Sequence, residues 1–468
     1  MHFHFPEVAG KTARGCGMRL SNMRQKSLIP CLFSGFSAML PAAHVSAAIE
    51  ILGVTELQRR PAADALKDWG AAHRFAGSKD RAFVASLVFD ALRQRASAQW
   101  LMDADDARST MLGALRLARG LDDGAIAALF SGEAHAPAPL TETEHDRLAR
   151  ANLDKAPDHV RGNYPEWLAP HFTAAFGARA ADEGAALAAR APLDLRANIN
   201  KGDRAGAMKK LAHLNPEACV LSPVGLRIPL KPDGRGAPMD AEPAYVKGFV
   251  EIQDEGSQLA AFASGAQPGE QALDLCAGGG GKALAIAALM HNKGQVYAHD
   301  SDGRRLMPIL PRIERAGARN IQLRPPRGKE DVLKDLAGRC DLVFVDAPCT
   351  GTGAWRRSPD AKWRMRPGAL ELRVKDQDAV LASAARYVKP GGRIVYVTCS
   401  VLIDENEARV QAFLAAHANF RALDAAETTK LAMLPALEPF ASPHGPGMRL
   451  TPLSAGTDGF YFAVLALA

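Results

Sequence analysis

The sequence lacks the features that would place it in a membrane, in a disulfide framework or around a zinc ion. Its seven cysteines are an odd number and no two form a CxxC pair, which fits neither a disulfide framework nor a zinc site. Free thiols indicate a reducing compartment. The apolar run 28–40 is interrupted by Pro30 and is too short to cross a bilayer. These absences predict a cytoplasmic protein with no membrane contact and no metal.

Two common glycine motifs are also missing. No GxGxxG occurs, and GxxxxGK[ST] is excluded at the best candidate because Ala283 follows Lys282. Instead, the strand-like run 271–276 ends in four glycines that lead into an Ala/Leu-rich helix, which suits a dinucleotide, a phosphate or the methionyl part of S-adenosylmethionine. The next run ends in Asp300, where an acid that holds a ribose belongs. The pattern predicts a Rossmann-like adenosine site and leaves oxidoreductase and methyltransferase open.

Two cysteines favour the methyltransferase. Cys349 and Cys399 each follow an apolar run of the kind found in buried parallel strands. Ligands of open α/β sheets bind outside the carboxyl ends of the strands, so both thiols are expected to face one crevice. A thiolate can add to carbon 6 of a pyrimidine, and carbon 5 can then take a methyl group from a sulfonium donor. The adduct must then lose the carbon 5 proton and release the enzyme, so a base is needed beside the nucleophile. The other thiol and the Asp346 carboxylate lie in the same predicted crevice and meet that need.

With these motifs the sequence resembles the RsmB/Sun-type RNA (cytosine-5) methyltransferases, which are class I enzymes that use S-adenosylmethionine. The resemblance runs from about Ala47 to the C-terminus. The matching segments are QDEGSQLAA at 253–261, DLCAGGGGK at 274–282, DAPCTGTG at 346–353, PDAKW at 359–363, TCS at 398–400 and GTDGF at 456–460.

The resemblance implies a role for each motif. Cys399 would attack carbon 6, Cys349 would assist breakdown of the covalent adduct, and Asp346 would hydrogen-bond the cytosine edge near N3. Lys282 would lie near the methionine carboxylate of S-adenosylmethionine, and Asp300 would hold its ribose. The full set of residues expected to bind the cofactor is Leu275, Cys276, Ala277, Gly278, Gly279, Gly280, Gly281, Lys282, Asp300, Arg305 and Asp346.

One departure and several alternatives stay open. The third strand of the family usually ends in an acid that meets the adenine, but here residues 321–326 read IQLRPP and contain no acid. The acids at 330–331 come later and are expected to cap a helix. Asp300 could instead be a helix N-cap, and Lys282 a solvated lysine. Glu405 and Glu407 are expected to cap or pair within their own helix. Three other cysteines are expected to be small buried hydrophobic residues: Cys219, Cys276 and Cys340.

The chain is too long for one core, so several domains are expected. We expect a disordered extension at 1–44, a helical RNA-docking domain at 45–136, a small α+β domain at 141–242 and the catalytic domain at 243–468. The catalytic fold is predicted to be α/β, with a mostly parallel Rossmann-like sheet and an antiparallel strand, 459–467, at its edge. Beyond Cys349, a positive rim is expected from Arg356, Arg357, Lys362, Arg364, Arg366, Arg373 and Lys375.

The predicted reaction is methyl transfer from S-adenosylmethionine to carbon 5 of a cytosine in RNA, with ribosomal RNA the expected partner. The formal charge of +6 is compatible with a polyanion. The alternative is a non-catalytic RNA-binding or ribosome assembly factor on the same fold, because the third-strand acid is missing. Methylation of DNA or of a small molecule is disfavoured by the two upstream basic domains.

Overall fold

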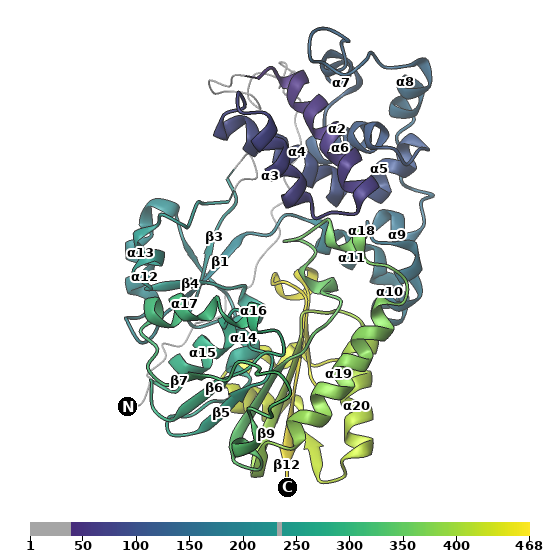
Figure 1. Cartoon of the computed structure of the whole chain (residues 1–468). Helices are drawn as coiled ribbons and strands as arrows, with labels where there is room; N and C mark the ends of the chain where they lie inside the picture. The colour runs from purple at the N-terminus through teal and green to yellow at the C-terminus, as the bar shows by residue number, and fades with distance from the viewer. Residues whose placement is uncertain (1–38, 232–235) are drawn as a thin grey trace, which may run out of the picture. The chain divides into compact units, whose positions relative to one another are not determined.

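The computed structural model describes residues 39–231 and 236–468, so most of the extension expected at 1–44 lies outside the described residues. The described chain from residue 39 onward belongs to one compact unit. None of the described helices is both long and apolar enough to cross a membrane. The three parts below follow one another along the chain (Figure 1).

The first part is helical, as the three- and four-residue spacing of its apolar residues predicts. Helix α2 buries Val45, Ala48, Ile51 and Leu52 on one face. The helices begin and end where capping residues stop them; α6, for example, starts after an aspartate and ends before Gly120 at φ 63°. The helices are α2 (Pro41–Gln58), α3 (Ala62–Ala72), α4 (Ser78–Arg93), α5 (Arg95–Met102), α6 (Ala107–Arg119), α7 (Asp123–Leu129), α8 (Glu142–Ala149), α9 (Asp158–Arg161), α10 (Ala169–Phe176) and α11 (Ala180–Ala188).

The second part is a small antiparallel sheet with strand order β2-β3-β1-β4. Between its strands lies α12 (Arg204–Lys210), which Asp203 caps by accepting a 2.7 Å hydrogen bond from the Gly206 amide. The strands are β1 (Leu193–Ala197), β2 (Glu217–Ala218), β3 (Gly225–Ile228) and β4 (Val250–Ile252). Because β4 pairs with β1, the small sheet takes its last strand from beyond residue 242.

The third part is a large sheet with strand order β10-β12-β9-β8-β5-β6-β7, in which β11 also pairs with β12. The five strands predicted from apolar runs are all present and all parallel: β5 (Gln271–Asp274), β6 (Gln295–Ala298), β7 (Ile321–Leu323), β8 (Cys340–Asp346) and β9 (Val388–Thr398). This is the predicted Rossmann-like α/β sheet.

The C-terminal strand β12 (Phe460–Leu467) pairs antiparallel with β9, as predicted. It is not the outermost strand, however, because β10 (Phe420–Ala422) and β11 (Met448–Leu450) both pair antiparallel with it. Three-residue strands such as these give too little period-two pattern to be recognised in the sequence. Short outer strands also leave few unpaired backbone groups at the edge.

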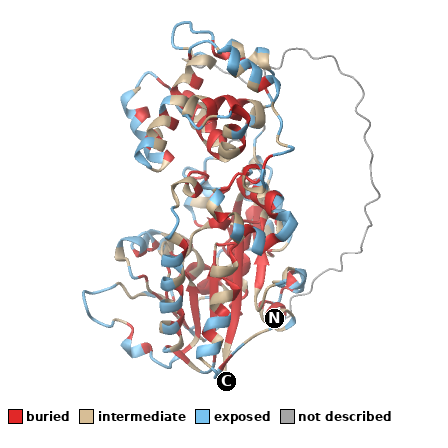
Figure 2. Cartoon of the chain, turned by 90° about the vertical axis from the view of Figure 1, so that its right-hand side faces the viewer, coloured by how far each residue is buried: buried red, intermediate tan, exposed pale blue. Residues whose placement is uncertain are grey.

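Helices cover both faces of the large sheet, and side chains of the strands alternate between two cores. Leu342 and Phe344 of β8 face one core, while Val343 and Val345 face the other. The first core is covered by α14 (Glu255–Phe262), α15 (Gly281–Leu289) and α17 (Ile309–Ala316), and the second by α19 (Ala369–Ala385) and α20 (Glu407–Ala416) (Figure 1). The edge strand β7 is only partly buried. Most residues of β5, β8 and β12 are buried, and the large sheet is mostly red in Figure 2. Burial on both faces explains their continuous apolar runs.

Candidate active site

The two predicted thiols lie side by side. Strands β8 and β9 run parallel with Asp346 opposite Val397, so the chain leaves both strands at the same edge of the sheet. Cys349 and Cys399 follow within three residues, and their sulfur atoms are 3.4 Å apart. The amide of Gly353 donates a 2.9 Å hydrogen bond to the Cys399 carbonyl, which ties the two loops together. The structure thus places both thiols in one crevice.

The two thiols are joined by a hydrogen bond in which either sulfur can be the donor. The pKa of Cys349 is raised well above its usual value by the hydrogen bond with Cys399, by burial, and by the charges of Cys399 and Glu405. A thiol whose pKa is raised holds its proton more firmly. The assignment of Cys399 as the nucleophile stays a prediction.

Lys282 and Asp346 form an ion pair next to the thiols. The Lys282 ammonium is 2.6 Å from Oδ2 of Asp346 and 5.4 Å from the centroid of the Phe460 ring. Burial acts to lower the pKa of Lys282, but Asp346 and the charge of Cys399 raise it above its usual value. Only 11% of the lysine side chain is exposed, so the alternative of a solvated lysine is wrong. Contact with a cofactor carboxylate stays a prediction.

The glycine loop joins β5 to α15 and has the backbone shape that its glycines permit. Gly280 has φ 81°, and a Cβ there would lie 2.1 Å from the Ile309 side chain. Gly278 has φ 48°, and its amide donates a 3.0 Å hydrogen bond to Asp300. Asp302, not Asp300, caps the following helix α16 (Gly303–Leu306), so the cap alternative for Asp300 is wrong.

The cofactor residues predicted before the glycines lie on the same turn. Leu275 and Ala277 are buried and Cys276 is half-buried, at the point where β5 ends. Arg305 is exposed, and its guanidinium lies 3.9 Å from the place where a Gly278 Cβ would be. The sequence prediction of buried cysteines is correct for Cys219 and Cys340.

Acidic groups dominate this loop. Asp274 is buried and accepts no hydrogen bond from a side chain. Burial, and then the negative charge of Asp346, raise its pKa to about 8 against the opposing charge of Lys282. Asp300 adds further negative charge. The sulfonium and ammonium groups of S-adenosylmethionine are positive, so these acids fit that cofactor.

Glu405 has partners that the sequence did not reveal. Its buried carboxylate accepts hydrogen bonds of 2.8 and 2.5 Å from the amide and hydroxyl of Thr350, and one of 3.0 Å from Gln377. It therefore fastens the loop after Cys349 to the segment after Cys399. The expectation that Glu405 serves its own helix is wrong, because its partners lie 28 and 55 residues away.

Glu407 also has partners outside its helix, contrary to expectation. It lies 3.6 Å from the Arg449 guanidinium and accepts a hydrogen bond from the Ser442 hydroxyl. Both acids occur in a run, DENEAR at 404–409, whose spacing resembles an ordinary helix start. A helix-start pattern does not distinguish a cap from a buried acid whose partners lie elsewhere in the chain.

Five of the seven cations predicted to form a positive rim are paired with acids or buried, while Arg366 and Lys375 are exposed. Arg356 and Arg357 both pair with Asp254 and Asp458. Lys362 is fully buried, because the Trp363 indole beside it donates a 2.6 Å hydrogen bond to the Leu92 carbonyl and holds this turn against α4. Arg364 and Arg373 pair with acids of their own segments. These cations are used within the fold or between its parts.

The third strand β7 ends without an acid, as the sequence indicated. Asp331 accepts a 3.2 Å hydrogen bond from the Leu333 amide, but the short turn Lys334–Leu336 has Leu333 at its N-cap position and no side-chain cap, so the expected capping role is wrong. Glu330 instead pairs through its backbone with Arg327. The adenine contact is not assigned to any side chain.

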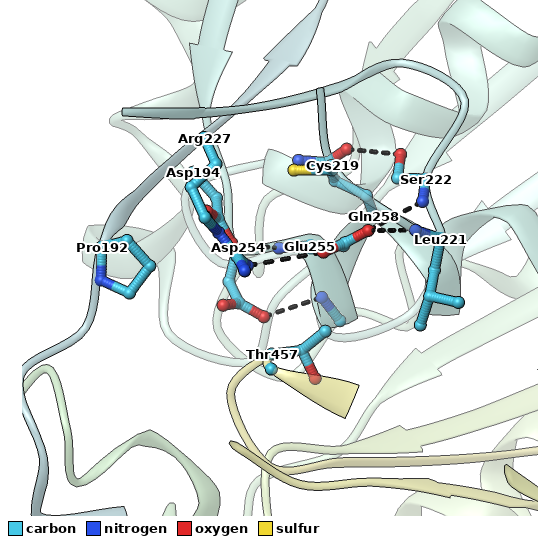
Figure 3. Close-up of polar contacts among 12 residues, drawn as sticks. Pro192, Asp194, Cys219, Leu221, Ser222, Arg227, Asp254, Glu255, Gln258 and Thr457 are labelled. Carbon is cyan, nitrogen blue, oxygen red and sulfur yellow. Dashed lines mark hydrogen bonds and ion pairs between the residues drawn. The ribbon is translucent and has the colours of Figure 1, made fainter. Parts of the chain in front are cut away.

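One cluster of metal-ligand residue types lies outside the crevice, among the described residues: Asp194, Cys219 and Glu255 (Figure 3). Arg227 already occupies it. Its guanidinium is 2.7 Å from Asp194 and 3.4 Å from Glu255, and Glu255 also accepts the amides of the 221–222 turn. The cluster connects the small sheet to α14 through ion pairs and hydrogen bonds, and Arg227 supplies the positive charge that pairs with both acids.

Known proteins share these features. Residues 262–466 match the family described as 16S rRNA methyltransferase RsmB/F. The chain is 33% identical over 262 residues to a probable ribosomal RNA small subunit methyltransferase B of Synechocystis, covering 55% of this chain and 58% of that protein, which is less than two thirds of it. It is 30% identical over 341 residues to a ribosomal RNA small subunit methyltransferase B of Pseudomonas syringae pv. tomato, covering 72% of this chain and 71% of that protein.

The fold is similar to the crystal structure of NSun6 from Pyrococcus horikoshii with SFG. The TM-score is 0.56 at 21% sequence identity, and the likeness covers 65% of this chain and 98% of that chain. At this level of identity the likeness concerns the fold. It supports the class I methyltransferase architecture built up above.

Glu405→Gln should destabilise the protein by about 1–3 kcal/mol, because the amide cannot accept from all three donors that the carboxylate satisfies. The free energy of unfolding in urea measures this. Asp404→Asn is the matched control, since Asp404 is half-exposed and pairs only with His171 and should lose less than about 1 kcal/mol. Equal losses in the two variants would contradict the role given to Glu405.

Asp274→Asn should remove a pH dependence of stability. A carboxyl group whose pKa is higher in the folded than in the unfolded protein does not reduce the free energy of unfolding at a pH below its unfolded pKa of about 4. As the pH rises from there to the folded pKa, the free energy of unfolding falls, because the unfolded state releases the proton more readily. With that pKa at about 8, the wild type should lose about 2 kcal/mol relative to the variant between pH 6 and pH 8. Chemical unfolding of both proteins without cofactor at pH 6 and pH 8 measures this difference. If the free energy of unfolding changed equally with pH in the wild type and in the variant, a raised pKa of Asp274 would be excluded.

Proposed function

Because the chain belongs to the 16S rRNA methyltransferase RsmB/F family, we propose that it methylates carbon 5 of a cytosine in small-subunit ribosomal RNA. The observation that carries this proposal is the 3.4 Å approach of the Cys349 and Cys399 sulfur atoms at the carboxyl edge of the sheet. A nucleophile and a neighbouring group for its release are what cytosine-5 chemistry requires. Redox chemistry on a dinucleotide needs neither thiol.

S-adenosylmethionine, when bound, supplies the methyl group. The loop 275–282 would hold its methionine part, where Gly278 and Gly280 allow close approach of the backbone. Asp300 would accept from the ribose hydroxyl groups with the lone pairs that its two backbone donors leave free. Asp274 and Asp346 would offset the positive charges of the cofactor.

The cytosine chemistry would then be carried by this chain's thiols and ion pair. The Cys399 sulfur adds to carbon 6, and the charge that develops on the ring is stabilised at N3 by the Asp346–Lys282 pair. Carbon 5 would take the methyl group as the bond from that group to the cofactor's sulfur breaks. The carbon 5 proton would then pass to Cys349 or Asp346 as the base, and the bond from the Cys399 sulfur to carbon 6 would break and return its electron pair to Cys399. Cys349, whose sulfur lies 3.4 Å from that of Cys399, would assist this release.

The substrate and its setting follow from the same geometry. Both thiols are half-buried, so a target base must leave any stack to reach them, and single-stranded or locally opened RNA is the expected form. A cytoplasmic location is part of the proposal, because the pair functions only with reduced thiols.

Cys399→Ala should abolish methyl transfer from labelled S-adenosylmethionine to total RNA of a strain that lacks this protein, because no other group can form the adduct. Bisulfite mapping of the wild-type product should show a single protected cytosine in small-subunit ribosomal RNA. Calorimetric titration of S-adenosylmethionine should give similar affinity for variant and wild type. Methylation by the variant would contradict the assignment of Cys399 as the nucleophile. A wild type that binds no cofactor would favour the alternative of a non-catalytic RNA-binding or assembly factor.

Cys349→Ala should trap the protein on RNA, because attack by Cys399 survives while release is slowed. A band of protein covalently bound to RNA should build up on denaturing gels and vanish after nuclease digestion. The double variant Cys349→Ala, Cys399→Ala is the control and should form no such band. If the single variant turned over as the wild type does, Cys349 would have no part in release.

A further inference from the structure

A cleft of about 280 Å³ lies apart from the residues assigned to the thiol crevice, and arginines dominate its lining. They come from separate parts of the chain: the last residue of α4, the segment after α11, and the loop that follows Cys349. The arginines are Arg93, Arg190, Arg356 and Arg357. The rest of the lining includes small and apolar residues, among them Ala191, Pro192 and Ala237.

On the side of α4, the ion pairs among the described residues use a single acid, Asp90. Asp90 is shared by two guanidinium groups, those of Arg119 at 2.7 Å and Arg190 at 2.5 Å. Arg93 forms no ion pair with any described residue; its guanidinium donates instead to the carbonyl oxygens of Ala188 and Ala189, at 3.1 and 2.8 Å. Its Nε is buried and without a hydrogen-bond acceptor.

On the opposite side, two arginines share two acids. Arg356 and Arg357 each contact both Asp254 and Asp458. Arg357 also donates a 2.8 Å hydrogen bond to the Pro192 carbonyl, which brings it to the cleft. Among the described residues, positive charge is therefore in excess, because Asp90, Asp254 and Asp458 are each shared by two guanidinium groups and Arg93 has no acid there.

This excess of positive charge affects Arg93. Burial, and then the charges of Arg190 and Arg356, lower its pKa to about 10, although Asp90 acts in the opposite direction. A guanidinium is seldom pushed this far, because it ordinarily stays charged at any pH that a protein meets. An anion in the cleft would relieve the repulsion and would accept hydrogen bonds from the unused guanidinium N–H groups.

We propose that this arginine cleft binds backbone phosphates of the RNA substrate next to the target cytosine. The inference rests on the proposed function and adds a binding site to it. Guanidinium groups bind phosphate in a bidentate manner, and phosphate contacts position a nucleic acid without reading its sequence. Arg356 and Arg357 lie on the loop whose Gly353 amide bonds to the Cys399 carbonyl, so RNA held here continues toward the thiols.

The test must change the charge of the cleft without removing an arginine that the fold uses. Ala191→Glu does this, because it adds a carboxylate to the lining at a half-buried position that has no role in the thiol crevice. Ala191→Gln is the matched control, with the same shape and no charge. Ala237→Glu and Ala237→Gln form a second pair elsewhere on the lining, in case the first position does not tolerate a longer side chain.

Binding of in vitro transcribed small-subunit ribosomal RNA is measured without cofactor at several salt concentrations. The glutamate variants should bind about tenfold more weakly than their glutamine partners, with a shallower dependence on salt, because fewer phosphates are neutralised. The affinity for S-adenosylmethionine and the melting temperature should not differ within each pair. In the methylation assay the loss should appear in KM for RNA and not in kcat.

Equal RNA affinity and equal salt dependence within both pairs would overturn the cleft as an RNA site. This result is distinct from failure of the proposed function. If the wild type bound RNA but methylated none, the reaction would be in doubt while the cleft was still tested by binding. If inorganic phosphate at millimolar concentration bound the glutamine variants and not the glutamate variants, while RNA affinity was the same within each pair, the cleft would bind a small anion only. That result would also overturn the proposal.

Discussion

The site depends on the parallel register of β8 and β9. Asp346 lies opposite Val397, and the two cysteines follow these paired residues after only three and two positions, at 349 and 399. A slip of one residue would turn every side chain of one strand to the other face and would exchange the two cores. The buried alternation of Leu342, Val343 and Phe344 prevents that slip. Packing of the sheet, and not the loops alone, thus sets the 3.4 Å separation of the thiols.

Charge is distributed differently at the crevice and at the arginine cleft. At the glycine loop, Asp300 and Asp346 lie near Asp274 together with the buried cation Lys282, and burial, followed by the charge of Asp346, raises the pKa of Asp274. At the arginine cleft, burial, followed by the charges of Arg190 and Arg356, lowers the pKa of Arg93. Each shift costs folding free energy that a ligand of opposite charge would return. A cationic cofactor and an anionic nucleic acid are ligands of those two kinds.

The sequence predicted the parallel strands, the glycine loop and the two thiols, because each depends on residues adjacent in the chain. It did not predict the partners of Glu405 or of Arg356, since these lie 28 to 102 residues away and no spacing rule links them. The predicted positive rim did not account for the ion pairs of Arg356, Arg357, Arg364 and Arg373 for the same reason: side-chain type gives charge, but only the fold shows which cations are paired. The short strands β10 and β11 were missed because three residues carry no period.

The helical part is fastened to the loop region that follows Cys349. Trp363 donates to the Leu92 carbonyl at 2.6 Å, and Lys362 donates to the Arg93 carbonyl at 3.4 Å. Burial and the charge of Arg93 lower the pKa of Lys362 well below its usual value, which favours a neutral amine there. These bonds end at the last turn of α4, whose final residue lines the arginine cleft. The helical part and the segment that follows Cys349 therefore meet at Arg93, the same residue that lines the arginine cleft.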